Sequence, residues 1–157
     1  MKHRTSYHTP IPDVDDYPVD DPSENTLTLR RSLVPDLPGV RPRVLFVEPE
    51  PAARRLGASL LDGACAVETA SSAEDAFVML CEKRYHVVVT DYGLAGRDGL
   101  WLLRFVERCQ PSARRVLHCG DPPERVGEHL RSGLVHAHVS KPASRSELVS
   151  SVIPAAP

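Results

Sequence analysis

The sequence lacks any apolar run approaching the roughly 20 residues that a helix needs to cross a bilayer. Residues 1–18 also lack the apolar stretch of a secretory signal. These two absences predict a cytoplasmic protein without a membrane partner.

An excess of charge of one sign is missing as well. The formal net charge of the 157 residues is only −2, and the chain carries no basic arm. A protein that binds the backbone of DNA or RNA needs a broad basic surface to neutralise the phosphates. We therefore expect no nucleic-acid partner.

Closely spaced cysteines are also absent. The four cysteines are widely separated, at Cys65, Cys81, Cys109 and Cys119, and none forms a Cys-x-x-Cys motif. A structural zinc site or a disulfide framework has closer pairs. We interpret the first three as small buried thiols in a reducing compartment. Cys119 is considered below.

The composition divides the chain into two regions. Residues 1–41 contain prolines at six positions, an acidic stretch from Asp13 to Asp21, and few apolar residues. Such a segment cannot bury enough apolar surface to offset its ordering entropy. It is predicted to be a disordered arm, with the alternative that Leu27–Leu29 and Leu33–Val34 dock on the domain or on a partner.

Residues 42–153 alternate short apolar runs with helical periods, and residues 154–157 form a short tail. The expected strands are residues 44–47, 64–69, 85–90, 115–119 and 134–139. The expected helices begin at Pro51, at Ser71–Ser72, after Asp98, at Asp121–Pro122 and at Ser144. This alternation predicts an α/β domain with a five-stranded, doubly wound parallel sheet and five helices.

Chemically capable residues follow three of these strands. Glu48 closes the first, Asp91 closes the third, and Lys141 comes after the fifth. Ligands of such sheets bind beyond the carboxyl ends of the strands, so these side chains should share one pocket. A carboxylate can accept a phosphoryl group, and a lysine can hold a phosphoryl oxygen.

Four stretches in order carry a family resemblance: VLFVEPE, VVVTDYGLAGRDG, ARRVLHCGD and HVSKP. Along residues 42–153 the chain resembles the receiver domains of bacterial response regulators, which have a flavodoxin-like fold and act in two-component phosphorelay signalling. The resemblance implies that Asp91 is the phosphoacceptor and that Lys141, followed by Pro142, contacts the phosphoryl group. Asp98–Gly99 matches the Asp-Gly that opens the third helix of the family, whereas Ala95 replaces its usual proline.

The family's acidic pair after the first strand is altered here to Glu48–Pro49. One carboxylate is kept, on a longer side chain, and the other is lost. Glu48, Asp91 and the carbonyl oxygen of Gly93 still offer three oxygen ligands for Mg²⁺. We expect weak magnesium binding, and we discount Glu50 because the family points that residue at solvent.

Two further positions depart from the family. Cys119 stands where a Ser or Thr donates to the phosphoryl group, and a thiol is a poorer donor. Lys141 nearby could lower its pKa and give it a redox role, but a relaxed position is the simpler interpretation. His138 takes the place of the switch aromatic, where it could add pH sensitivity or be a plain exposed residue. A metal site built from His118, His136 and His138 is disfavoured.

These features predict a single-domain response regulator, phosphorylated on Asp91 by a histidine kinase or phosphotransfer protein and not itself an enzyme. Because residues 154–157 leave no room for an output domain, the signal is expected to pass by protein contact. The resemblance implies the surface formed by the helix before Gly133, the strand 134–139 and the last helix.

The family's carboxylate is missing at Pro49 and its hydroxyl is missing at Cys119. These departures support an alternative, a pseudo-receiver that binds partners without phosphorylation. An aspartate-dependent phosphatase is disfavoured, because that class has Asp-x-Asp after the first strand and this chain has Glu48-Pro49-Glu50.

Overall fold

The computed structural model describes residues 13, 15 and 40–154, so the predictions for most of the arm lie outside the described residues. Strands and helices alternate through the described domain. The strands are β1 (Arg43–Val47), β2 (Ala66–Ala70), β3 (Val87–Thr90), β4 (Arg114–Cys119) and β5 (Ala137–Ser140). The helices are α1 (Pro51–Leu61), α2 (Ala73–Glu82), α3 (Gly99–Cys109), α4 (Val126–Ser132) and α5 (Arg145–Val152).

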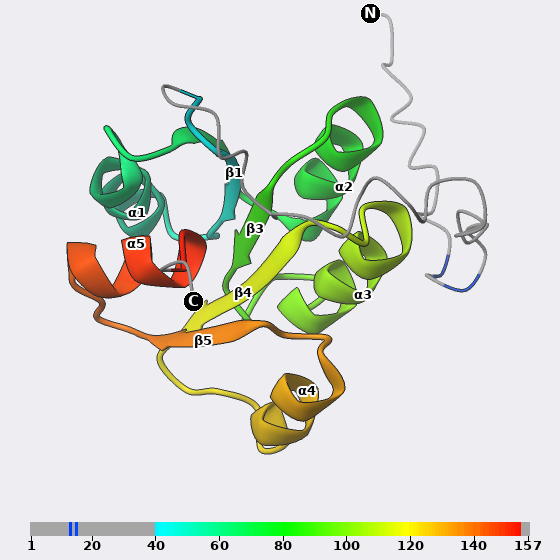
Figure 1. Ribbon diagram of the computed structural model, residues 1–157. Coiled ribbons are helices and arrows are strands. Elements are labelled where there is room, and N and C mark those ends of the chain that lie inside the picture. Colours follow the sequence, from blue (N-terminus) through cyan, green and yellow to red (C-terminus); the bar gives the residue numbers. More distant parts are fainter. Residues whose placement is uncertain (1–12, 14, 16–39, 155–157) are drawn as a thin grey trace, which may run out of the picture.

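All strands are parallel and form one sheet in the order β2-β1-β3-β4-β5. Helices α1 and α5 pack on one face, α2 and α3 lie side by side on the other, and α4 lies beside β5 (Figure 1). The predicted doubly wound fold is therefore confirmed. The order changes direction between β1 and β3, which places a switch point at the carboxyl ends of these two strands.

Alternating side chains of the strands build a core on each face of the sheet. Leu45 and Val47 of β1 join the apolar cluster under α2 and α3, whereas Val44 and Phe46 join the one under α1 and α5. These four side chains are at most 1% exposed. The continuous apolar run in the sequence is thus explained by burial on both faces.

The helix starts follow the expected capping chemistry, with one exception. Ser72 caps α2, and Ser144 and Glu147 form a capping box at α5. The prediction that Asp121–Pro122 opens a helix is wrong, because α4 begins at Val126. Pro122 is itself followed by a proline, which disfavours helical backbone at that residue.

The interpretation of the cysteines is corrected in part. Cys65 is buried at 2% exposure, whereas Cys109 is intermediate and Cys81 is exposed on the outer side of α2. The helical stripe of α2 that faces the sheet consists of Ala73, Ala76 and Leu80, and Cys81 lies one residue past it.

Candidate functional site

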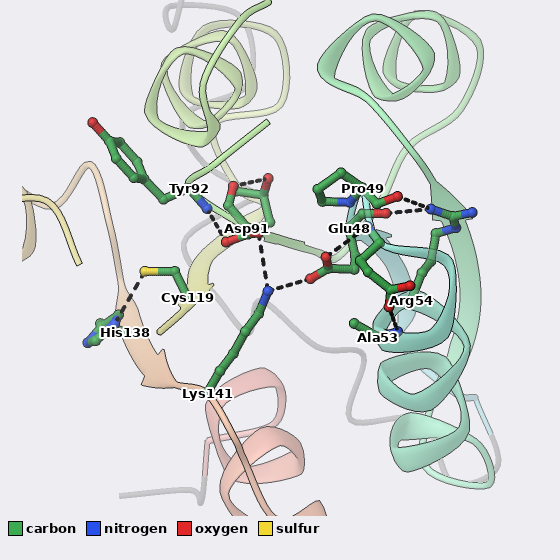
Figure 2. Close-up of polar contacts among 11 residues, drawn as sticks. Glu48, Pro49, Ala53, Arg54, Asp91, Tyr92, Cys119, His138 and Lys141 are labelled. Carbon is green, nitrogen blue, oxygen red and sulfur yellow. Dashed lines mark hydrogen bonds and ion pairs between the residues drawn. The ribbon is translucent and has the colours of Figure 1, made fainter. Parts of the chain in front are cut away.

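Residues from three separate strand ends meet at the carboxyl edge of the sheet. Figure 2 shows Lys141, after β5, pointing between Glu48, after β1, and Asp91, after β3. Its Nζ atom lies 2.5 Å from Glu48 Oε2 and 3.2 Å from Asp91 Oδ2. The predicted convergence of these three side chains in one pocket is confirmed.

Hydrogen bonds fix both the carboxylate and the backbone carbonyl of Glu48. Its side chain is almost completely buried, and Oε1 accepts a hydrogen bond from the Glu50 backbone N–H at 3.1 Å. The guanidinium of Arg54 donates to the carbonyl oxygens of Glu48 at 2.6 Å and Pro49 at 3.1 Å (Figure 2). These bonds fix the turn between β1 and α1, so the carboxylate reaches the pocket in one orientation.

Glu50 does not join the pocket. Its carboxylate caps α1 and accepts the Ala53 N–H at 2.5 Å. Backbone hydrogen bonds from Ala53 and Ala52 lower the pKa of this carboxyl, as expected for an anion at a helix N-terminus. Glu50 therefore lies outside the set of pocket ligands, as the resemblance implies.

Asp91 is positioned by the main chain on both sides. Its N–H donates to the Val47 carbonyl at 2.9 Å, which extends the β1–β3 ladder, and its Oδ1 accepts the Tyr92 N–H at 2.7 Å. Gly99 packs against the Asp91 backbone so closely that a Cβ at Gly99 would lie 2.1 Å from the Asp91 carbonyl oxygen. The Asp-Gly motif therefore has a steric reason at its second residue, while Asp98 caps α3.

The ammonium of Lys141 contacts both carboxylates. Burial by itself favours the neutral amine, but hydrogen bonds to Glu48 and Asp91 outweigh it and raise the pKa of Lys141. The side chain is therefore a fixed positive charge at neutral pH. It neutralises part of the negative charge that gathers at the strand ends.

Cys119, at the end of β4, lies beside His138 of β5, with 3.6 Å between Sγ and Nε2 (Figure 2). The thiol is 2% exposed. Burial raises the pKa of Cys119, and the Asp91 carboxylate raises it further against the smaller opposite effect of Lys141. Lys141 does lower this pKa, as expected, but burial outweighs it, so the net pKa is raised and the thiol stays protonated at neutral pH.

His118 of β4 immediately precedes Cys119. It lies on the α1 and α5 side of the sheet, with its ring centroid 5.8 Å from that of Phe46. Neither ring nitrogen has a hydrogen-bond partner in the part of the chain that the structure describes. Burial, followed by the charge of Lys141, lowers the pKa of His118 to about 4, so the ring is neutral.

The donor set limits what metal the pocket can hold. Within residues 13, 15 and 40–154, no three His, Cys, Asp or Glu side chains cluster closely enough to bind a metal ion. Glu48 and Asp91 nevertheless reach the same ammonium, so their carboxylates converge on one point where a cation sits. Two carboxylates fit a weakly held Mg²⁺ that keeps most of its water.

Sequence comparisons agree with this arrangement. Residues 44–153 match the family model of the response regulator receiver domain. The uncharacterized transcriptional regulatory protein YesN of Bacillus subtilis is 29% identical over 91 residues, which are 57% of this chain and 24% of that protein. The chain thus spans about a quarter of the length of this curated relative.

Solved structures share the fold. The signal receiver domain of an HD domain-containing protein from Pseudomonas fluorescens Pf-5 aligns with a TM-score of 0.66 and 25% identity, covering 71% of this chain and 91% of that one. The chemotaxis response regulator CheY4 of Vibrio cholerae aligns with a TM-score of 0.62 and 17% identity, covering 71% and 95%. Within the described residues, no helix is long and apolar enough to cross a membrane.

Proposed function

The chain belongs to the family of response regulator receiver domains, and we propose that it accepts a phosphoryl group on Asp91 from a phosphohistidine of a histidine kinase or phosphotransfer protein. In this transfer the phosphorus–nitrogen bond to the donor imidazole breaks as a bond to an Asp91 carboxylate oxygen forms. The donor imidazole keeps the electron pair and takes up a proton. The product is an acyl phosphate.

The observation that carries this proposal is the pair of contacts made by Lys141. Its ammonium lies 3.2 Å from Asp91 Oδ2, within reach of a phosphoryl group attached there. A transferring phosphoryl group spreads negative charge over its oxygens, and a fixed cation stabilises that charge. Asp91 Oδ1 is held by the Tyr92 N–H, which orients the carboxylate.

Glu48, Asp91 and the backbone carbonyl of Gly93 would hold a magnesium ion at this pocket. When bound, the ion neutralises negative charge on the phosphoryl oxygens. With Pro49 in place of a second acidic residue, the site has fewer charged ligands, so we expect binding to be weak.

The signal then passes by contact with another protein, and the domain itself is not an enzyme. We place the output surface on α4, β5 and α5. Support comes from α4, none of whose residues from Val126 to Ser132 is buried, and from Leu130, which is 39% exposed. An apolar side chain on a helix that is loosely attached to the core suits a transient partner.

Labelling with acetyl phosphate in the presence of Mg²⁺ tests the proposal. We expect one phosphoryl group per chain by intact-mass analysis, absent from Asp91→Asn and greatly reduced in Lys141→Ala. Ser140→Ala, at an exposed neighbour of Lys141, is a matched control that should label normally. Failure to label the wild-type chain, while a known receiver domain labels under the same conditions, would refute the assignment.

A second function is favoured by two observations, namely the missing carboxylate at Pro49 and the buried, protonated thiol of Cys119. Both weaken the usual response to phosphorylation. In this alternative the chain is a pseudo-receiver that binds its partner without chemistry at Asp91. An Asp91→Asn chain of normal stability that still supports the biological output would favour the alternative, whereas loss of output would remove it.

A further inference from the structure

An aromatic and basic stripe runs along one side of α3. Trp101, Phe105 and Arg108 occupy positions i, i+4 and i+7, so they share one helix face, which we call the α3 stripe. The Trp101 and Phe105 rings lie 6.1 Å apart and nearly parallel. Phe77 of the neighbouring helix α2 completes the aromatic cluster at 4.7 Å from Phe105, and the Arg97 guanidinium lies 5.1 Å from the Trp101 ring.

The indole of Trp101 is buried with an unmet hydrogen bond. The residue is 8% exposed, and its Nε1 atom has no hydrogen-bond partner among residues 13, 15 and 40–154. Buried indole N–H groups normally find an acceptor, because leaving the donor unpaired costs free energy. The Trp101 edge of the α3 stripe therefore lacks one hydrogen-bond acceptor among the described residues.

One described residue of the N-terminal region reaches this stripe. Asp15 Oδ1 lies 3.2 Å from the guanidinium of Arg108, although the two residues are far apart in sequence. The Asp15 side chain is 92% exposed, so this ion pair alone contributes little to stability. It shows, however, that Asp15 lies against the end of α3.

The charges of the two segments are complementary. Residues 13–21 contain five aspartates and one tyrosine, Tyr17, with no basic residue. Around the α3 stripe, Arg97, exposed Arg104 and Arg108 are positive, and the nearby Glu107 contacts Arg115 at 3.5 Å. A polyacidic segment gains more from several such cations than one exposed pair does, and the attraction weakens with salt.

We propose that residues 13–21 are an intramolecular ligand of the α3 stripe, held by pairs between aspartates and arginines and covering the Trp101 edge. An oxygen of this segment supplies the acceptor for the indole N–H. The segment closes the α2–α3 face to other proteins at low ionic strength. Because Asp98 caps α3 through the Trp101 N–H, the covered face adjoins the loop that follows Asp91.

The sole tryptophan reports on this contact directly. In the full chain at low salt, acrylamide should quench Trp101 poorly. Replacing Asp13, Asp15 and Asp16 by Asn should raise the quenching constant about two-fold, by removing the charges that attract the segment. Adding 0.5 M NaCl to the wild type, which shortens the Debye length to about 4 Å, should have a similar effect.

Charge reversal provides the matched pair of variants. Arg108→Glu should increase quenching as the neutralised variant does, whereas Arg131→Glu, the same charge reversal at an exposed arginine of α4, should not. Combining Arg108→Glu with Asp15→Arg should lower the quenching constant below that of Arg108→Glu alone. Equal quenching in that double variant and in Arg108→Glu would overturn the pairing of these two residues.

Two results overturn the proposal as a whole. One is a quenching constant that stays at the wild-type value in both the neutralised variant and Arg108→Glu. The other is protection of Trp101 that disappears on dilution, because an intramolecular contact is independent of protein concentration. That second result would assign the stripe to the acidic segment of another copy.

Discussion

Acid should destabilise this domain above the range where carboxylates titrate, because two histidines are kept neutral by the fold. Burial lowers the pKa of His118 from 6.5 to about 4, and burial together with Arg115 and Arg114 lowers that of His136 to about 4. The geometry at His136 agrees, since Nδ1 accepts the Arg115 backbone N–H at 2.9 Å and must be unprotonated to do so.

The sign and size follow from proton linkage. Each ring binds its proton more weakly in the folded state than in the unfolded chain, so stability is complete above pH 6.5 and is lost as the pH falls towards 4. A pKa change of this size corresponds to about 2 kcal/mol of lost stability per ring at pH 5. Solvent reaches part of both rings, so we expect about 2–3 kcal/mol for the two together.

Urea unfolding followed by Trp101 fluorescence at pH 7.5 and pH 5 measures this loss. His136→Asn keeps an acceptor near the place of Nδ1, and His118→Leu suits the apolar neighbourhood of Phe46. The double variant should lose most of the difference between the two pH values. A small pH dependence of the free energy of unfolding should remain in this double variant, because burial also lowers the pKa of His86. A wild-type stability equal at both pH values, or a double variant as acid-sensitive as the wild type, would refute the reasoning.

Three substitutions test other parts of the structure. Gly99→Ala drives a methyl group into the Asp91 carbonyl, so it should cost about 2 kcal/mol or more in urea unfolding and reduce labelling by acetyl phosphate. Pro49→Asp restores a carboxylate beside the pocket and should tighten Mg²⁺ binding about ten-fold in calorimetric titration. Arg115→Lys loses forked contacts to buried carbonyls and should lower the free energy of unfolding by about 2 kcal/mol.

Each of these has a control on the same chain. A Cβ at Gly120 meets nothing within 4 Å, so Gly120→Ala should leave stability within about 0.5 kcal/mol of wild type. Pro51→Asp adds the same charge at the first turn of α1 and should leave Mg²⁺ affinity nearly unchanged. Arg104→Lys, at an exposed site on α3, should be neutral. If controls and test variants behave alike, the local contacts named here do not explain the effects.

The sequence predicted the fold well because its signals were local and mutually consistent. The Val87–Val89 run and the capping box at Ser144 each specify an element through nearby residues alone. The start of α4 was mispredicted because Asp121–Pro122 is a good helix start in isolation. The proline that follows it changes the backbone, and α4 buries no residue between Val126 and Ser132 that would compensate.

The candidate site was predictable where topology alone brings residues together. Glu48, Asp91 and Lys141 follow from strand ends in a parallel sheet. The guanidinium of Arg54 was not anticipated, because its bonds to the Glu48 and Pro49 carbonyls depend on how the first turn of α1 folds back. The raised pKa of Cys119 was not anticipated, because burial, which outweighs the nearby ammonium, cannot be read from sequence spacing.

The geometry of the pocket predicts how a phosphoryl group on Asp91 and a bound Mg²⁺ affect each other. Lys141 lies closer to Glu48 than to Asp91, at 2.5 Å against 3.2 Å. A phosphoryl group on Asp91 competes with Glu48 for the Lys141 ammonium. If the ammonium moves to the phosphoryl group, Glu48 keeps the Glu50 N–H as a partner, although its side chain is buried and only 2% of the residue is exposed. A buried carboxylate without a paired cation costs free energy, so a second cation is favoured beside Glu48. We therefore expect phosphorylation and magnesium to favour each other here, even though Pro49 makes the resting pocket a weak metal site.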